Sequence, residues 1–361
     1  MTSRHGPLPR WTGPLLGLPL LIGAAGAAVA FEGDEGATDE ASAQVASLSF
    51  KALKKWDIIV PNEVWTSITD SLPIPLAGGD GFVAEQVGPM KLKVDTNSDG
   101  KVDKDVRGAD GFLVLSAEDE AGDTQKFAVR FVNQGGKYKY SVSGVMAGKL
   151  NSTAIELIDR NGNGRYDDYG QDAIVVGNAK GASLLSRVVS ADDELFSIEV
   201  SEDGSQLTYS PYSGPTAKID VSSKHDCRGK LLSAVISSDD GEYHFNVARD
   251  KGSMVVPAGD YRFVYGFAAK GAETVQMRTG KMRTLELDAD EQEVVAWGGP
   301  IVAEFDYAVS DETITVQPKV AFYGGAGEEY HTFTPNAKSP KILVADKDTK
   351  KIYLEGRFGG C

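Results

Sequence analysis

The chain has 361 residues, with 37 lysines and arginines against 52 aspartates and glutamates, and a formal net charge of −15 at pH 7. This acidity repels nucleic acid and anionic lipid and favours cations, so neither of the first two is expected as a partner. With 41% hydrophobic residues, 25% charged residues and 41 glycines, the composition is that of a turn-rich globular protein long enough for two domains.

Residues 1–30 have the features of a secretion signal. Arg4 and Arg10 precede an uncharged stretch that ends on the small-x-small sequence Ala28-Val29-Ala30. The alternative, a membrane anchor, is disfavoured because two prolines and a run of small residues make a weak spanning helix. Cleavage would leave 35 bases against 52 acids, a net charge of −17. We therefore expect a secreted, periplasmic or cell-surface protein without membrane insertion after cleavage.

The rest of the chain predicts a mainly β fold with little helix. Residues 31–47 are small, acidic and without periodicity, and read as a flexible linker. Short apolar runs bounded by Gly, Asp and Asn then predict a β domain over 48–180 and a β-sandwich domain over 181–361. The best helix candidate is 62–72, which Pro73 ends. The predicted strands are 56–60, 90–94, 111–115, 126–132, 138–145, 154–158, 173–176, 184–189, 195–200, 206–211 and 217–221.

One turn in the second half has a family likeness. Pro257-Ala258-Gly259-Asp260 feeds an alternating strand with Tyr261, Phe263 and Tyr265 on one face, which we predict to be core. The turn resembles the Pro-Ala-Gly-x-Tyr entry of transthyretin-like and carboxypeptidase-regulatory-like sandwich domains. That resemblance implies an immunoglobulin-like sandwich and no activity.

Two loops have the spacing of a calcium site. Asp95-Thr96-Asn97-Ser98-Asp99-Gly100 places oxygen-bearing side chains at positions 1, 3 and 5 and glycine at position 6, a DxDxDG-type loop. Calcium takes six to eight hard oxygens, and glycine lets the chain turn around the ion. Asp159-Arg160-Asn161-Gly162-Asn163-Gly164 repeats the pattern between similar strand-like flanks, so we interpret the two loops as an internal repeat.

These loops resemble the calcium loops of the EF-hand, dockerin and thrombospondin type 3 families over about ten residues each. Carried over residue by residue, the resemblance implies a first site made by Asp95, Asn97, Asp99, the Lys101 carbonyl and Asp103. It implies a second site made by Asp159, Asn161, Asn163, the Arg165 carbonyl and Asp167.

Both loops depart from the EF-hand at position 12. Where that family has a bidentate glutamate, this chain has Val106 and Gly170. A carboxylate must close each site from elsewhere, and the nearby candidates are Asp105 or Asp110 for the first loop and Asp168 or Asp172 for the second. The flanks are strand-like, so we expect β-hairpin calcium loops in which Ca²⁺ orders acidic segments. The alternative is that Asp, Asn and Gly only make turns here.

Other chemistry has weaker support. His225-Asp226-Cys227 sets three reactive types side by side, yet neighbours on a strand point to opposite faces. Zinc-ligand spacings and nucleophile motifs are absent from the sequence. Two alternatives to a non-enzymatic calcium-binding protein stay open. The first is a carbohydrate-binding or adhesion module that uses Trp56, Trp65 and Trp297 on a surface polysaccharide or protein, and the second is a hydrolase with paired carboxylates.

The two cysteines, Cys227 and Cys361, are able to pair in an exported protein, and an unpaired state is the alternative. Composition and loops together resemble those of uncharacterised secreted bacterial proteins of a planctomycete-like kind. That likeness is one of style across the chain rather than of a motif.

Overall fold

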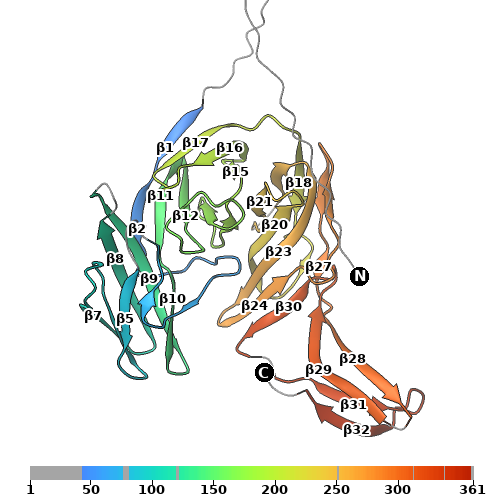
Figure 1. The fold of residues 1–361 in the computed structure, drawn as a ribbon. Helices are drawn as coiled ribbons and strands as arrows, with labels where there is room; N and C mark the ends of the chain where they lie inside the picture. Colours follow the sequence, from blue (N-terminus) through green and yellow to red (C-terminus); the bar gives the residue numbers. More distant parts are fainter. Residues whose placement is uncertain are drawn as a thin grey trace, which may run out of the picture. The chain divides into compact units, whose positions relative to one another are not determined.

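The computed structural model describes residues 43–75, 81–118, 122–249, 252–311, 313–336 and 338–358. Within these ranges every regular element is a strand, which confirms the mainly β prediction (Figure 1). None of the described segments is a helix long and apolar enough to cross a membrane. The predicted signal peptide and linker residues 31–42 lie outside the described residues. The last linker residues, Gln44–Ser47, are not flexible linker but form the first strand, β1.

A five-stranded antiparallel sheet is covered on both faces around its strand β13. Its strand order is β14 (Ser183–Leu184), β13 (Ala173–Val176), β12 (Thr153–Ile158), β11 (Gly144–Leu150) and β2 (Ser49–Ala52). Along β13, Ala173 and Val175 join one hydrophobic core while Ile174 joins another. Because successive side chains point to opposite faces, a strand covered on both sides reads as a continuous apolar run. We call this the central sheet.

The first core covers one face of the central sheet. It is closed by two further four-stranded sheets, whose buried side chains include Phe82, Leu115 and Phe131. One sheet has the order β3 (Thr66–Ser67), β10 (Lys137–Val142), β9 (Thr124–Gln134) and β8 (Asp110–Glu118). The other has the order β4 (Ser71–Leu72), β5 (Phe82–Gln86), β6 (Lys91–Val94) and β7 (Lys104–Arg107).

The opposite face of the central sheet packs on strands from the other half of the chain. This layer has the order β1 (Gln44–Ser47), β17 (Gln206–Pro211), β16 (Glu194–Val200) and β15 (Val188–Ala191). Ala46 and Leu157 share a core with Phe196 and Leu207. The predicted domain boundary between residues 180 and 181 therefore falls inside a packed sandwich.

The remaining strands enclose a third core. The largest sheet has the order β21 (His244–Asn246), β20 (Lys230–Ser238), β23 (Gly259–Lys270), β24 (Glu273–Arg278), β30 (Glu329–Thr334), β29 (Thr313–Tyr323) and β28 (Val302–Ser310), with β25 (Leu285–Leu287) also on β23. A second sheet has the order β22 (Met254–Pro257), β18 (Thr216–Asp220) and β26 (Gln292–Val294), and β19 (His225–Asp226) pairs with β27 (Trp297–Gly298). Tyr261, Phe263 and Tyr265 are buried in β23, which confirms their prediction as core.

The last two strands, β31 (Lys341–Ala345) and β32 (Ile352–Arg357), form a separate antiparallel hairpin. Figure 1 draws this hairpin, together with β28 and β29, at the red end of the ribbon.

The helix predicted over 62–72 is wrong. Asn62 takes a left-handed backbone conformation with φ 47°, and β3 and β4 occupy the rest of the segment by pairing with β10 and β5. Thr66, Ile68 and Thr69 are β-branched and lose rotamer freedom in a helix, so the strand partners decide the outcome. The predicted strand over 56–60 makes only a single bridge, between Ile59 and Gly181.

The shared core makes a stability prediction. Leu207→Ala removes a side chain that is 0% exposed between two sheets and should lower the free energy of unfolding by about 2–5 kcal/mol. Met90→Ala, at a side chain that is 50% exposed, should change it by less than about 0.5 kcal/mol. Urea unfolding followed by circular dichroism measures both free energies of unfolding. Equal effects of the two substitutions would contradict the packing of the two sheets across residues 180 and 181.

Candidate calcium loops

Both predicted calcium loops connect neighbouring antiparallel strands. Loop 1, residues 95–103, joins β6 to β7, in which Val94 pairs with Lys104. Loop 2, residues 159–172, joins β12 to β13, in which Ile158 pairs with Ala173. The prediction of β-hairpin loops rather than helix-flanked ones is confirmed.

The first aspartate of each loop organises the backbone in the same way. Asp95 is 1% exposed and its Oδ2 accepts the Gly100 N–H at 2.8 Å, and Asp159 is 0% exposed and its Oδ2 accepts the Gly164 N–H at 2.7 Å. The two glycines have φ of +79° and +82°, a region that favours glycine. The internal repeat read from the sequence is therefore also a repeat of loop conformation.

A second hydrogen bond recurs one turn further on. The backbone N–H of Lys101 donates to Asp99 Oδ1 at 2.9 Å, and that of Arg165 donates to Asn163 Oδ1 at 2.9 Å. Such bonds also occur in ordinary Asx turns, so they do not distinguish a calcium loop from a turn.

Loop 2 has a feature that a turn does not need. Since Ile158 pairs with Ala173, the next residues outward, Asp159 and Asp172, face each other at the end of the central sheet. Both are buried, at 0% and 1% exposure. Burial first, and then repulsion between the carboxylates, raises the pKa of Asp172 to about 8, and burial raises that of Asp159 to about 6.

Asp172 is also incompletely paired. Its Oδ2 accepts the Asp168 N–H at 3.0 Å, and a backbone hydrogen bond from Arg160 also lowers the pKa of this carboxyl, whereas its Oδ1 is buried and has no partner at normal hydrogen-bond geometry. An unpaired buried polar atom costs about 1–3 kcal/mol, so a protein interior rarely leaves one without a ligand or water.

A third carboxylate lies beside this pair. Asp168 Oδ2 accepts the amide N–H groups of Asn161 at 2.9 Å and Asn163 at 2.6 Å. The predicted ligand Asp167 points elsewhere, because both of its oxygens bond to Arg165, at 3.2 and 3.1 Å. The carboxylate that contacts both asparagines is therefore Asp168, and not Asp167, while Asp172 bonds the backbone of Asp168.

These oxygens are of the kind that a hard divalent cation prefers. Asp159, Asp168 and Asp172, the two asparagine carbonyls and the Arg165 backbone carbonyl would supply six oxygens, the lower end of the calcium range. Both asparagine amides donate their N–H groups to Asp168. Across the described residues, no three His, Cys, Asp or Glu side chains are arranged to hold a metal. Binding an ion here would require the two amides to present oxygen and the three carboxylates to move together.

Loop 1 brings fewer of its predicted ligands together. Asp103 accepts the Thr96 N–H at 2.8 Å and the Thr96 hydroxyl, which turns it toward that residue. Asp105 is engaged by Arg107 and Lys91, whose hydrogen bonds hold its pKa below the usual value. Asp110 is exposed at the start of β8. The predicted ligands of loop 1 that are not engaged elsewhere are Asp95, Asn97, Asp99 and the Lys101 carbonyl.

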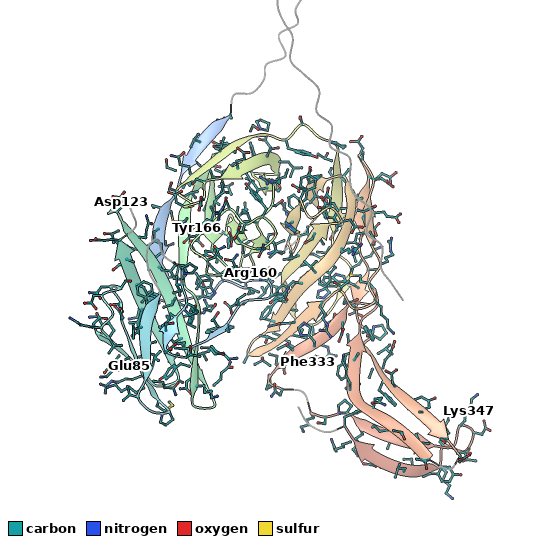
Figure 2. The ribbon with its side chains drawn as sticks, viewed as in Figure 1. Glu85, Asp123, Arg160, Tyr166, Phe333 and Lys347 are labelled. Carbon is teal, nitrogen blue, oxygen red and sulfur yellow. The ribbon has the colours of Figure 1, made fainter. Side chains whose placement is uncertain are left out.

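Loop 2 is also tied into the fold at two points. The Arg160 guanidinium donates to the carbonyls of Asn62, at 3.1 Å, and Gln171. Tyr166, 7% exposed, packs in the core between the central sheet and β16–β17, and its N–H donates to the Glu202 carbonyl at 2.9 Å (Figure 2). The loop is thus part of a core and not a free surface turn.

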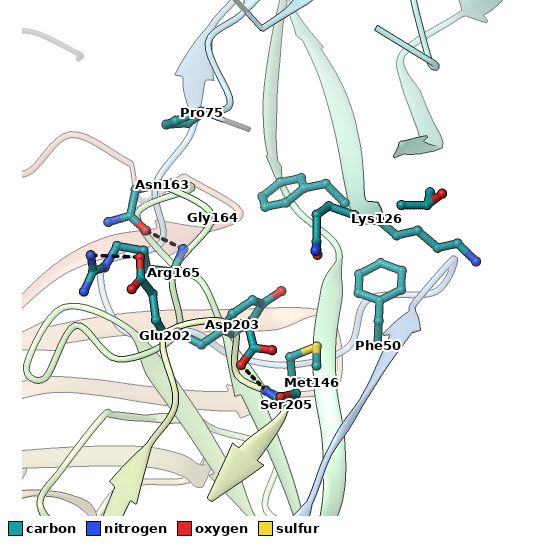
Figure 3. Close-up of a pocket in the computed structure, with 14 residues that line it drawn as sticks. Phe50, Pro75, Lys126, Met146, Asn163, Gly164, Arg165, Glu202, Asp203 and Ser205 are labelled. Atoms are coloured by element: carbon teal, nitrogen blue, oxygen red, sulfur yellow. Dashed lines mark hydrogen bonds and ion pairs between the residues drawn. The ribbon is translucent and has the colours of Figure 1, made fainter. Parts of the chain in front are cut away.

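An open cleft of about 940 Å³ lies beside loop 2. Figure 3 shows Arg165 turned toward Glu202 on the loop side, with Phe50 and Lys126 across the cleft. Of the aromatic rings in its lining, Tyr166 and Phe127 are buried and Phe50 is partly exposed.

The other candidate residues have structural surroundings. Trp297 is 2% exposed and donates to the Val221 carbonyl at 2.6 Å. Trp56 and Trp65 both lie against the Arg130 guanidinium, at 4.4 and 5.0 Å, and do not form an exposed row.

His225 and Cys227 have separate contacts. The His225 ring packs on that of Trp297 at 4.6 Å, and Cys227 Sγ accepts only the Gly229 N–H. Cys227 is exposed and Cys361 lies outside the described residues, so the predicted pairing stays a prediction.

No known protein was found to be similar to this chain. The scan against family models and the searches of curated proteins and of solved structures returned no match.

The buried carboxylates predict how the calcium-free protein responds to pH. Because the fold raises both pKa values above 3.8, it holds protons that the unfolded chain releases. Stability in chelator should therefore be greatest near pH 4 and fall as pH rises through about 6 and about 8. Thermal melts between pH 4 and pH 8 measure how the melting temperature changes with pH.

Asp172→Asn removes one titrating group and should flatten this fall in stability, whereas Asp167→Asn, at a partly exposed carboxylate paired with Arg165, should leave it unchanged. A calcium-free wild type whose stability rises steadily up to pH 8, by the same amount as that of Asp172→Asn, would contradict this assignment.

Proposed function

We propose that the protein is an exported, non-enzymatic calcium-binding protein in which Ca²⁺ has a structural role at loop 2. The observation that supports this most strongly is the buried, unpartnered Oδ1 of Asp172, which lies opposite the buried carboxylate of Asp159. The likeness of the two loops to known calcium loops points the same way. Export rests on the signal-like residues 1–30.

The energetics favour a cation in this place. One pKa unit corresponds to about 1.4 kcal/mol, so ionising both Asp159 and Asp172 near neutral pH costs several kcal/mol without a counter-ion. A bound divalent ion makes ionisation of the two carboxylates favourable, since its charge is larger than any other in the pocket. It would also replace the amide N–H groups as the partner of Asp168.

The chemistry of the donors favours calcium over other ions. All candidate ligands are oxygens, whereas zinc and other transition metals prefer nitrogen or sulfur. Magnesium demands near-ideal octahedral geometry and keeps several waters, while calcium accepts irregular sets that include neutral carbonyls. Two asparagines in place of aspartates reduce the charge of the site, which suits the millimolar calcium outside cells.

A structural role follows from where the loop is attached. An ion at loop 2 would bridge the ends of β12 and β13 in the central sheet and stabilise the packing of Tyr166. Catalysis is disfavoured because Asp159 and Asp172, the paired carboxylates, are closed to a substrate by burial. Loop 1, with fewer converging oxygens, would bind a second ion more weakly.

The test is a calorimetric calcium titration of the chain from Phe31, with melts in calcium and in chelator. The wild type should bind at loop 2 with the higher affinity, and Asp159→Ala should abolish that event. Calcium at about 100 times its dissociation constant should stabilise the wild type by about 2.7 kcal/mol per site.

Two further variants make the test specific. Asp95→Ala should remove only the weaker event. Asp167→Asn, next to Asp168 but paired with Arg165, should bind like the wild type. A wild type that ignores millimolar calcium would refute the function, and equal losses in Asp167→Asn and Asp168→Asn would refute the ligand set.

A further inference from the structure

A small cavity lies where the edge strands of four sheets meet. β14 ends the central sheet, β15 ends the layer that packs on it, and β21 and β22 end the two sheets around the third core. β14 lies beside β21, and β15 lies beside β22. Sheet faces pack by interdigitating their side chains, whereas edges that meet do so less completely. A partly enclosed cavity of about 160 Å³ remains here, which we call the edge cavity.

One part of the cavity wall is apolar. Ile174 and Val176 are two residues apart on β13 and so share a face of that strand. Val189, Phe245 and Met254 add side chains from β15, β21 and β22. A cavity of about 150 Å³ is large enough for benzene, so the edge cavity has room for a molecule of about six non-hydrogen atoms. The apolar wall favours an occupant with a hydrocarbon part.

Two buried serines in the wall have no hydrogen-bond partner. Ser183 is 7% exposed and Ser190 is 8% exposed, and the Oγ atoms of both are unpartnered. A third such hydroxyl, that of Ser233, is close by, since a Cβ added to Gly181 in the wall would lie 2.8 Å from it. By contrast, buried Ser143 donates to a backbone carbonyl at 2.7 Å. Because buried hydroxyls normally have partners, this group of serines points to a polar ligand.

The charge of the wall is positive. Among the described residues that line the cavity there is no Asp or Glu, and Arg249 carries the formal charge. Arg249 Nη1 donates to Asp193 Oδ1 at 2.8 Å, but the Asp193 side chain is 81% exposed, so water screens this pair, and the guanidinium has further N–H donors. His244 is engaged by the Ser237 hydroxyl at 2.7 Å and the Gly241 carbonyl at 3.0 Å, and burial lowers its pKa.

The polar groups of the wall act mainly as donors. The side-chain carbonyl of Asn246, which could accept from a ligand, already accepts the backbone N–H groups of Ala234 at 2.9 Å and Ala248 at 3.3 Å. The guanidinium only donates, and a serine hydroxyl is able to donate. A carboxylate accepts from both kinds of group, and hydrogen bonds to an ionised acceptor are the stronger ones.

From these observations we propose that the edge cavity binds a small monocarboxylate of about four carbons. Its carboxylate accepts hydrogen bonds from the hydroxyls of Ser183 and Ser190 and is attracted by Arg249. Its hydrocarbon part packs on Ile174 and Met254. This site is separate from both calcium loops and does not depend on the proposed role of calcium.

An NMR titration of the isotope-labelled chain from Phe31 with butyrate tests the proposal. The backbone signals of Ser183, Ser190 and Asn246 should shift, with a dissociation constant below about 1 mM. Butyramide has nearly the same shape and no charge, so it should bind at least about tenfold more weakly. Equal binding of the two compounds would overturn the carboxylate assignment, and the absence of shifts with either would overturn the site.

Variants of the wall locate the binding. Ser183→Ala and Ser190→Ala should each weaken butyrate binding about fivefold to tenfold. Neither should lower the melting temperature, because each removes a buried hydroxyl that has no protein partner. Arg249→Gln should weaken the binding of butyrate more than that of butyramide. Ala248→Leu adds bulk to the wall and should abolish the binding of both compounds.

Ser143→Ala is the matched control. It removes a buried hydroxyl that has a partner, so it should lower the melting temperature and leave butyrate binding unchanged. Melts without ligand check that each variant is folded. Butyrate binding that keeps its wild-type affinity in Ser183→Ala, Ser190→Ala and Ala248→Leu would place the ligand elsewhere and overturn the proposal.

Discussion

The burial of strand β13 on both of its faces is the constraint on which the candidate site depends. Residues of β13 alternate between two cores, so neither face of the strand is open to solvent. The residues directly before and after such a strand are therefore close to the protein interior. Asp159 follows β12 and Asp172 precedes β13, and both are buried for this reason. Two carboxylates opposite each other in a dry place are costly, and that cost is what makes a bound cation favourable.

The two loops show how similar sequences acquire different electrostatics from their surroundings. Their first aspartates bond the backbone alike, at 2.8 and 2.7 Å, because that bond is local. Loop 1 ends an outer sheet, where Asp105 meets Lys91 and Arg107. Loop 2 ends the central sheet, where Arg160 and Arg165 hydrogen-bond to backbone carbonyls and Asp167, and only the charge of Arg160 acts on Asp172 from a distance.

The C-terminal hairpins, β28–β29 and β31–β32, present the opposite case to the central sheet. Every side chain of β28 is exposed, although the strand has the alternating apolar pattern of a buried one. A sheet that is packed on both faces excludes water from the carboxylates at its end. A hairpin that nothing packs on leaves its apolar side chains exposed. The buried carboxylates of loop 2 and the exposed side chains of β28 both follow from how completely each sheet is covered.

Local pattern determined much of this protein from sequence alone. Runs such as 173–176 and 206–211 match strands β13 and β17 residue for residue, and the spacing of Asp, Asn and Gly fixed both hairpin loops, because strand alternation and Asx turns are local. The predicted helix over 62–72 failed because distant strands β10 and β5 supplied partners for that segment.

Only the tertiary structure decided the rest. Sequence could name Asp168 and Asp172 as candidates, but it could not place them beside the asparagines or turn Asp167 toward Arg165. It could not show that the layer holding Leu207 crosses the expected domain boundary, or that β28 lacks cover. Burial and the approach of like charges depend on which sheets pack together, and that is set by contacts between residues far apart in the chain.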